Sequence, residues 1–144
     1  MYVSIEGFLK YGSIGEVVVG MSRGAVLSLI SEPAGYYRGK NINDAELWVN
    51  GPLIIWFKDN LVDQLGLYFQ TDYESNRNIS FVEWFPRKDT TIVEISEYMD
   101  EHRINFSKSG KDLITKSGTV ITCSGESLNS VIYPDITKRL KNNA

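Results

Sequence analysis

The side chains best able to act as a nucleophile, a general base or a metal ligand are the single histidine, His102, and the single cysteine, Cys123. A metal site would need further His or Cys residues at ligand spacing, which the sequence does not supply. His102 lies on the apolar stripe of a predicted helix, where a packed or helix-end histidine is far commoner than a ligand. Cys123 lies in the middle of an apolar predicted strand, where a thiol usually acts as a small core residue. We therefore expect neither a metal site nor a Cys-His nucleophile.

Paired carboxylates could act as acid and base in hydrolysis if their side chains faced each other. Asp59 with Asp63 is one such pair, and Glu97 with Glu101 is another. Turn chemistry explains Asp59 better, and a solvated helix face explains Glu97 and Glu101 better. The glycines near the N-terminus do not have the spacing of a phosphate-binding loop, and no Gly-Lys-Ser follows them. The sequence thus predicts a protein that is not an enzyme and that needs no cofactor.

Aromatic residues are the strongest candidates for binding another protein, because Trp and Tyr present a large area with few rotatable bonds to restrict. The predicted strands contain Trp48, Trp56, Tyr68 and Trp84. Trp56 lies in a wholly apolar run and is expected in the core. Trp48 is expected to point outward, because the residues on either side of it are apolar and would face inward. We therefore predict that Trp48, Tyr68 and Trp84 contact a partner.

Acidic residues accompany the aromatic ones in and near the polar segment 71–78. Asp72, Tyr73 and Glu74 lie within this segment, and Glu83 lies in the next predicted strand. A mixture of acidic and aromatic side chains suits the rim of a surface that binds a basic protein, although solvated loops often have the same composition. These four residues complete the predicted partner-binding set.

The overall composition is that of an ordinary soluble domain, with 144 residues of which 42% are hydrophobic and 23% are charged. The net charge of −3 argues against nucleic acid as the partner, because phosphate binding draws on clustered Lys and Arg, and it favours a basic partner protein. The first residues do not resemble a secretory signal, and no apolar stretch approaches the ~20 residues of a membrane-spanning helix. We expect a cytoplasmic protein with no membrane partner.

Turn residues and apolar spacing divide the first half of the chain into a helix followed by strands. Ser22 is a good N-cap, the apolar residues after it recur every three or four positions, and Pro33 ends the helix. Residues 35–41 have no apolar period and are interpreted as a loop. Within the strand 61–69, strict alternation places Leu61 on the apolar face and Val62 on the opposite one. Asn-Gly and Asp-Asn turns separate the predicted strands, which are 47–49, 53–57, 61–69 and 79–85.

The same order of elements recurs from about residue 88. A second helix is expected to be capped by Asp89 or Thr90, with acidic residues on its outer side. Its apolar stripe consists of Ile92, Ile95, Met99 and His102. The strands predicted after it are 113–115, 120–122 and 128–133. Because turn positions repeat as well as elements, the two halves are interpreted as copies of one unit.

These patterns predict an α+β fold in a single domain, residues 1–144, built from two helix–β-meander halves at about 15–86 and 88–140. Neither half has enough core to be stable alone. The meanders are therefore expected to join into one long, twisted antiparallel sheet with both helices on one face. The other face is then partly open, and an open curved sheet is suited to binding a protein.

The segment from Gly20 to Pro33, GMSRGAVLSLISEP, resembles the opening of a group of bacterial helix-plus-meander proteins, with the pattern G-M-s-x-x-x-V-L-x-L-I-G-x-P. The group includes beta-lactamase inhibitory protein, small outer-membrane assembly lipoproteins, and immunity proteins of contact-dependent growth inhibition and other polymorphic toxin systems. Ser31 stands where the group usually has glycine, and the lack of a lipoprotein signal argues against the membrane-assembly branch. The segment from Ile95 to Ile121 is similar to the second half of several such immunity proteins.

The resemblance to immunity proteins implies that the chain binds and neutralises one cognate toxin domain, such as a nuclease, by blocking its active site or a neighbouring surface. It transfers no binding residues, because each toxin–immunity pair has its own contacts. Two other interpretations remain open: a different protein-binding inhibitor or assembly adaptor on the same scaffold, and a small enzyme with its pocket on the concave sheet face.

Overall fold

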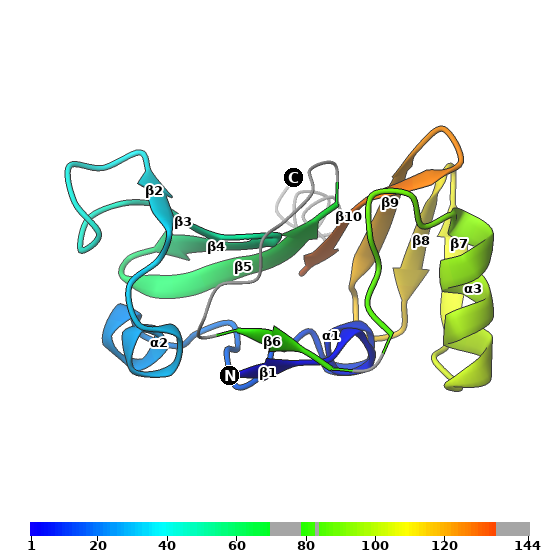
Figure 1. Ribbon diagram of the computed structural model, residues 1–144, viewed down its shortest axis with the longest axis horizontal. Helices are drawn as coiled ribbons and strands as arrows, with labels where there is room; N and C mark the ends of the chain where they lie inside the picture. Colours follow the sequence, from blue (N-terminus) through cyan, green and yellow to red (C-terminus); the bar gives the residue numbers. More distant parts are fainter. Residues whose placement is uncertain (70–78, 83, 135–144) are drawn as a thin grey trace, which may run out of the picture.

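A computed structural model describes residues 1–69, 79–82 and 84–134 (Figure 1). The helices are α1 (Ile5–Tyr11), α2 (Arg23–Ile30) and α3 (Ile92–Glu101). The strands of the first part are β1 (Tyr2–Val3), β2 (Gly35–Tyr37), β3 (Leu47–Asn50), β4 (Leu53–Lys58) and β5 (Leu61–Tyr68). The strands of the second part are β6 (Ser80–Phe81), β7 (Phe106–Ser109), β8 (Asp112–Thr115), β9 (Val120–Ser124) and β10 (Ser127–Tyr133). The predicted α+β class is confirmed.

An antiparallel sheet of eight strands, in the order β2-β3-β4-β5-β10-β9-β8-β7, forms the body of the protein. Strands that follow one another in the chain are neighbours on each side of the centre, β2 to β5 on one side and β7 to β10 on the other. The strands β5 and β10 join the two meanders, with Leu67 opposite Val131. Figure 1 shows α3 beside the β7 and β8 end of this sheet, and α2 and the β1–β6 pair alongside β4 and β5. Helix α1 lies near the β8–β9 turn, where the Ser117 and Thr119 hydroxyls donate to the Leu9 and Phe8 carbonyls.

The segment before Ser22 forms elements that the sequence patterns did not predict. Strand β1 pairs in parallel with β6, and α1 begins at the N-cap Ser4, whose hydroxyl accepts a hydrogen bond of 3.2 Å from the Gly7 amide. The predicted strand 79–85 is correspondingly wrong in length. Its paired part is limited to Ser80–Phe81, because β6 pairs with the two-residue β1 and not with the main sheet.

The predicted loop 35–41 is also wrong in its first part, where β2 pairs with β3 at the edge of the sheet. The side chains of Tyr36 and Tyr37 are both exposed. An edge strand with little burial has no apolar period, so spacing alone could not identify it.

Side-chain caps define where the two longer helices begin. Ser22 is the N-cap of α2, as predicted, and its hydroxyl accepts from the Ala25 amide at 3.2 Å. The cap of α3 is Thr91 and not Asp89 or Thr90. Thr91 forms a capping box with Glu94, in which each side chain accepts a hydrogen bond of 3.2 Å from the other residue's amide. The Thr90 hydroxyl instead accepts from the Arg87 amide in the preceding turn.

The hydrophobic core lies against one face of the eight-stranded sheet. A cross-strand row that is almost fully buried runs through Leu53, Leu67, Val131, Ile121 and Leu113. All three helices contribute buried residues to the same cluster, including Phe8, Leu9, Val26, Ile30, Ile95 and Met99. Burial of this continuous apolar surface is the main stabilising contribution to the fold.

A β-bulge at Asp63 changes which side of β5 faces the core. Trp56 pairs with Gln64 and Phe57 pairs with Val62, so Asp63 is the extra residue. The expectation of strict alternation is therefore wrong at the start of the strand. Val62 is buried, whereas Leu61 is exposed. The inserted residue shifts the period by one, which a pattern of apolar residues cannot reveal.

Candidate protein-binding surfaces

The second face of the sheet carries a half-buried apolar surface. It alternates with the core row along each strand and crosses six strands in register. The apolar residues of this second sheet face are Leu47, Val49, Ile54, Trp56, Tyr68, Ile114, Val120 and Ile132. Gln64 pairs with Trp56 and Ser130 pairs with Tyr68, so both lie on the same face, and both are buried. The apolar side chains are half-buried, so the surface is mainly apolar and partly accessible.

Trp56 and Tyr68 form the aromatic centre of the second sheet face. Their ring centroids lie 6.1 Å apart at 55°, and both rings cover Gly66. A Cβ atom at Gly66 would lie 3.0 Å from Trp56 Cζ3 and 3.3 Å from Tyr68 Cε2, so the close approach of the rings requires glycine there. Burial raises the pKa of the Tyr68 hydroxyl. Two rigid amphipathic rings held side by side are well suited to contact a partner.

The expected positions of Trp48 and Trp56 are the reverse of those observed. Trp48 is 1% exposed, donates its indole N–H to the Ile42 carbonyl at 2.9 Å, and packs edge-on against Phe57 at 4.5 Å. The guanidinium of Arg23 lies over the same two rings. The expectation failed because apolar residues occupy both faces of β3 and β4, so the sequence shows no alternation there. Register alone places Trp48 opposite buried Ile55, on the core face.

Four of the residues predicted to contact a partner lie outside the described residues. They are Asp72, Tyr73, Glu74 and Glu83. Of the predicted partner-binding set, Tyr68 lies on the second sheet face, Trp48 lies in the core, and Trp84 lies elsewhere, against α3.

Trp84 forms part of the lining of an acidic and aromatic pocket. The indole stacks on the Tyr98 ring at 4.7 Å and 27°, and Tyr98 stacks in turn on His102 at 3.9 Å and 24°. Glu94, Glu97 and Glu101 complete the lining, and the cavity has a volume of about 450 Å³. We name this site the α3 pocket. The sequence indicated Trp84 but not its stacking partners, which lie in a different element.

The ionisable residues considered for catalysis are explained by local structure. His102 is the C-cap of α3, and its Nδ1 lies 2.9 Å from the Tyr98 carbonyl oxygen. Because a carbonyl can only accept, Nδ1 carries the proton in this contact. Burial, followed by the charge of Asp112, raises the pKa of the Cys123 thiol and so disfavours the thiolate. Asp59 has a positive φ of 54° in the β4–β5 turn. Among the residues that the structure describes, no group of three or more His, Cys, Asp and Glu side chains could hold a metal ion.

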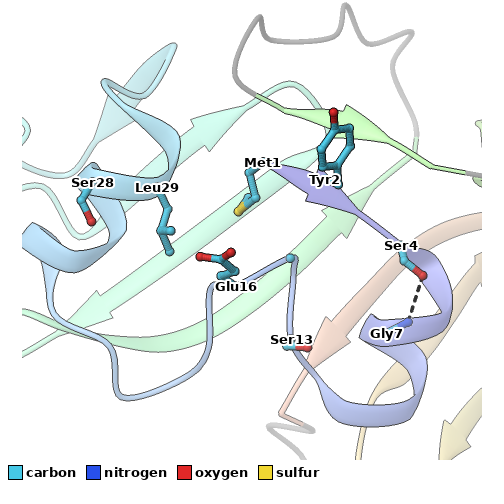
Figure 2. A pocket seen from close by; sticks show the side chains of 9 residues that line it. Met1, Tyr2, Ser4, Gly7, Ser13, Glu16, Ser28 and Leu29 are labelled. Carbon is cyan, nitrogen blue, oxygen red and sulfur yellow. Dashed lines mark hydrogen bonds between the residues drawn. The ribbon is translucent and has the colours of Figure 1, made fainter.

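Figure 2 shows a second cavity, of about 560 Å³, which the sequence did not indicate. It is bounded by β1, α1, α2 and the segment between the helices, and its lining consists of Met1, Tyr2, Ser4, Gly7, Ser13, Gly15, Glu16, Ser28 and Leu29. Glu16 contributes the carboxylate of this lining. The hydroxyl of Ser4 is engaged in capping α1, and Ser28 donates to the Ala25 carbonyl at 2.6 Å. The cavity therefore combines apolar side chains, small polar side chains and one carboxylate.

Comparisons with protein-family models, curated proteins and solved structures found no significant match. Within the described part of the chain, no helix is both long and apolar enough to cross a membrane.

Proposed function

We propose that this chain is an immunity protein, which binds a cognate bacterial toxin domain through the second sheet face and neutralises it by direct contact. The observation that carries the proposal is the accessible apolar surface centred on Trp56 and Tyr68. Aromatic and aliphatic side chains grouped on a rigid sheet are the composition of the energetically dominant part of protein interfaces. The net charge of −3 would also speed association with a basic toxin.

Two matched sets of hydrogen bonds support the proposed duplication of a helix–meander unit. Ahead of α2, the Val62 amide of β5 donates to the Met21 carbonyl at 2.8 Å. Ahead of α3, the Leu128 amide of β10 donates to the Thr90 carbonyl at 2.7 Å. On the other side of each cap, the first residue of the helix donates to a turn. The Arg23 amide donates to the Asn60 carbonyl in the β4–β5 turn, and the Ile92 amide donates to the Glu126 carbonyl in the β9–β10 turn. Each helix is thus tied by its first residues to the start of the last strand of its own meander.

The bulges provide a second correspondence between the halves. Asp63 is the extra residue of β5, and the register shift between Leu128 and Ser130 makes Asn129 the extra residue of β10. Each extra residue comes directly after the strand residue whose amide makes the hydrogen bond described above: Asp63 follows Val62, and Asn129 follows Leu128. Bulges are specific features of a fold, so equal placement in both halves favours a common unit. In this arrangement α2 and α3 would cover one face of the shared sheet and leave the second sheet face to the partner.

Growth rescue tests the proposed function. Toxin domains encoded beside the gene for this chain would be expressed in bacteria with and without the chain, and survival would be measured. We expect rescue from one toxin, together with a purified complex whose affinity is measured by calorimetry. Ile54→Asp, on the second sheet face, should abolish rescue, because it would bury a charge in the interface. Val93→Asp is the matched control, since Val93 is exposed on α3.

Different results would contradict specific parts of this proposal. Rescue that survives Ile54→Asp would exclude the second sheet face as the binding surface. Rescue that is lost equally in Val93→Asp would show that the loss does not depend on that face. Protection without a complex, or with turnover of a small molecule, would favour the enzyme interpretation.

A further inference from the structure

The α3 pocket combines flat aromatic rings with the negative charge of three glutamates. Tyr98 is held between Trp84 and His102 and is 8% exposed, so the stack is a fixed part of the packing. Trp84 keeps 36% of its surface exposed, which leaves part of the indole accessible. The carboxylates of Glu97 and Glu101 lie on the exposed side of the same helix.

The two glutamates are spaced so that they repel each other. Glu97 and Glu101 are at i and i+4 on α3, where like charges destabilise a helix. Neither forms an ion pair with any residue in the described ranges. Glu94 is different, because one of its carboxylate oxygens already accepts hydrogen bonds from the amide and hydroxyl of Thr91. A cation between Glu97 and Glu101 would relieve their repulsion while Glu94 maintains the cap.

We propose that the α3 pocket binds an arginine side chain presented by a partner protein. A guanidinium is planar, so it can stack on the exposed part of Trp84, and it carries several N–H donors in one plane for the carboxylates of Glu97 and Glu101. An ammonium group is a compact point charge and would use the carboxylates but not the stacking plane. The pocket therefore favours arginine over lysine.

The source of the guanidinium follows from the open position of the pocket. Free arginine also carries an α-ammonium and an α-carboxylate, and Glu94, Glu97 and Glu101 would attract the first and repel the second. In a protein both groups are part of peptide bonds and are neutral, so the guanidinium alone is recognised. The exposed position of the glutamates also allows a side chain to enter from the surface of a docked protein. This site is separate from the second sheet face, so the proposal does not depend on the function proposed above.

Short peptides test the pocket without any toxin. The probe is acetyl-Gly-Arg-Gly-amide, added to the full chain at pH 8 and low salt while the Trp84 indole N–H and the His102 ring are followed by NMR. We expect saturable shifts of both signals. The same peptide with citrulline should cause no saturable shift, because citrulline has the shape of arginine without its charge. The lysine peptide should bind several-fold more weakly, and free arginine should bind no more tightly than the arginine peptide.

Variants assign the effect to named side chains. Glu97→Gln combined with Glu101→Gln should weaken binding of the arginine peptide about tenfold, which corresponds to ~1.4 kcal/mol. Asp100→Asn is the matched control, because Asp100 is an exposed carboxylate on α3 outside the pocket lining, and it should change the affinity little. Thermal unfolding midpoints close to that of the unaltered chain would show that the variants are folded.

Three outcomes would overturn the proposal. One is that the citrulline and arginine peptides cause equal shifts, which would mean that charge is not recognised. Another is that the Trp84 and His102 signals do not move at millimolar arginine peptide. The last is that the double glutamine variant binds the arginine peptide as tightly as the Asp100→Asn control. Replacing Trp84 with Leu provides a second check, because it removes the stacking plane and should weaken binding as followed through His102.

Discussion

Replacing each of two tryptophans with alanine distinguishes the two faces of the sheet. Trp48 and Trp56 lie on neighbouring strands and undergo the same chemical change, but Trp48 faces the core and Trp56 faces the second sheet face. We expect Trp48→Ala to destabilise the fold strongly and Trp56→Ala to destabilise it weakly. Conversely, Trp56→Ala should weaken binding of the partner.

The magnitude for Trp48 follows from what its side chain touches. Truncation leaves a cavity beside Phe57, removes the hydrogen bond to the Ile42 carbonyl and exposes the Arg23 guanidinium that lies over the ring. Loss of a buried tryptophan typically lowers the free energy of unfolding by about 3–5 kcal/mol. For a chain of this length that corresponds to a midpoint lower by roughly 9–15 °C. Trp56 is only half-buried, so its truncation should lower the free energy of unfolding by about 1–2 kcal/mol.

Urea unfolding followed by far-UV circular dichroism measures both values, since tryptophan fluorescence is itself altered by the substitutions. Linear extrapolation with equal slopes gives the difference in free energy between the variants. If Trp56→Ala cost as much stability as Trp48→Ala, the assignment of faces would be wrong. If only Trp48→Ala weakened partner binding while the chain remained folded, the second sheet face would not be the interface.

Three further effects can be measured on the purified chain. Gly12→Ala should lower the free energy of unfolding by more than ~1 kcal/mol in a thermal melt, because its φ is +70° and the new Cβ would lie 2.5 Å from the Tyr133 ring. Cys123 should react slowly with iodoacetamide at pH 7, and the midpoint of its rate–pH curve should lie above 9.0, because burial raises the pKa of the thiol. The Glu6 carboxyl should titrate below 4.5 by NMR, because the Lys10 ammonium donates a hydrogen bond to it. Replacing Lys10 with Met should raise that midpoint.

Each of these predictions has an outcome that would contradict it. A Gly12→Ala variant with unchanged stability would show that α1 and β10 can separate without cost. Rapid alkylation of Cys123 at pH 7 would return the thiol to consideration as a nucleophile. A Glu6 midpoint unchanged by Lys10→Met would remove the ion pair as the cause.

Because the lowered pKa of Glu6 favours the charged form in the folded state, its stabilising effect is present above its ordinary pKa and is lost as the pH falls through the folded pKa.

Local signals in the sequence were sufficient for much of the main sheet and for the start of α2. Asn50-Gly51 and Asp59-Asn60 are turns, the runs between them are strands, and Ser22 caps α2. These features depend on the preferences of a few adjacent residues, and such preferences can be recognised without knowledge of the tertiary contacts. The acidic outer side of α3 could be predicted for the same reason, because helical spacing separates it from the buried stripe.

Tertiary structure decided which side chains face the core and which form the candidate sites. The bulge at Asp63 reversed the faces at the start of β5, and cross-strand register, not apolar content, buried Trp48 and left Trp56 half-buried on the other face. The stack of Trp84 on Tyr98 joins residues that no local pattern connects. Register and side-chain stacking are set by contacts between distant segments, and a strand that is apolar on both faces has no periodicity to indicate which face is buried.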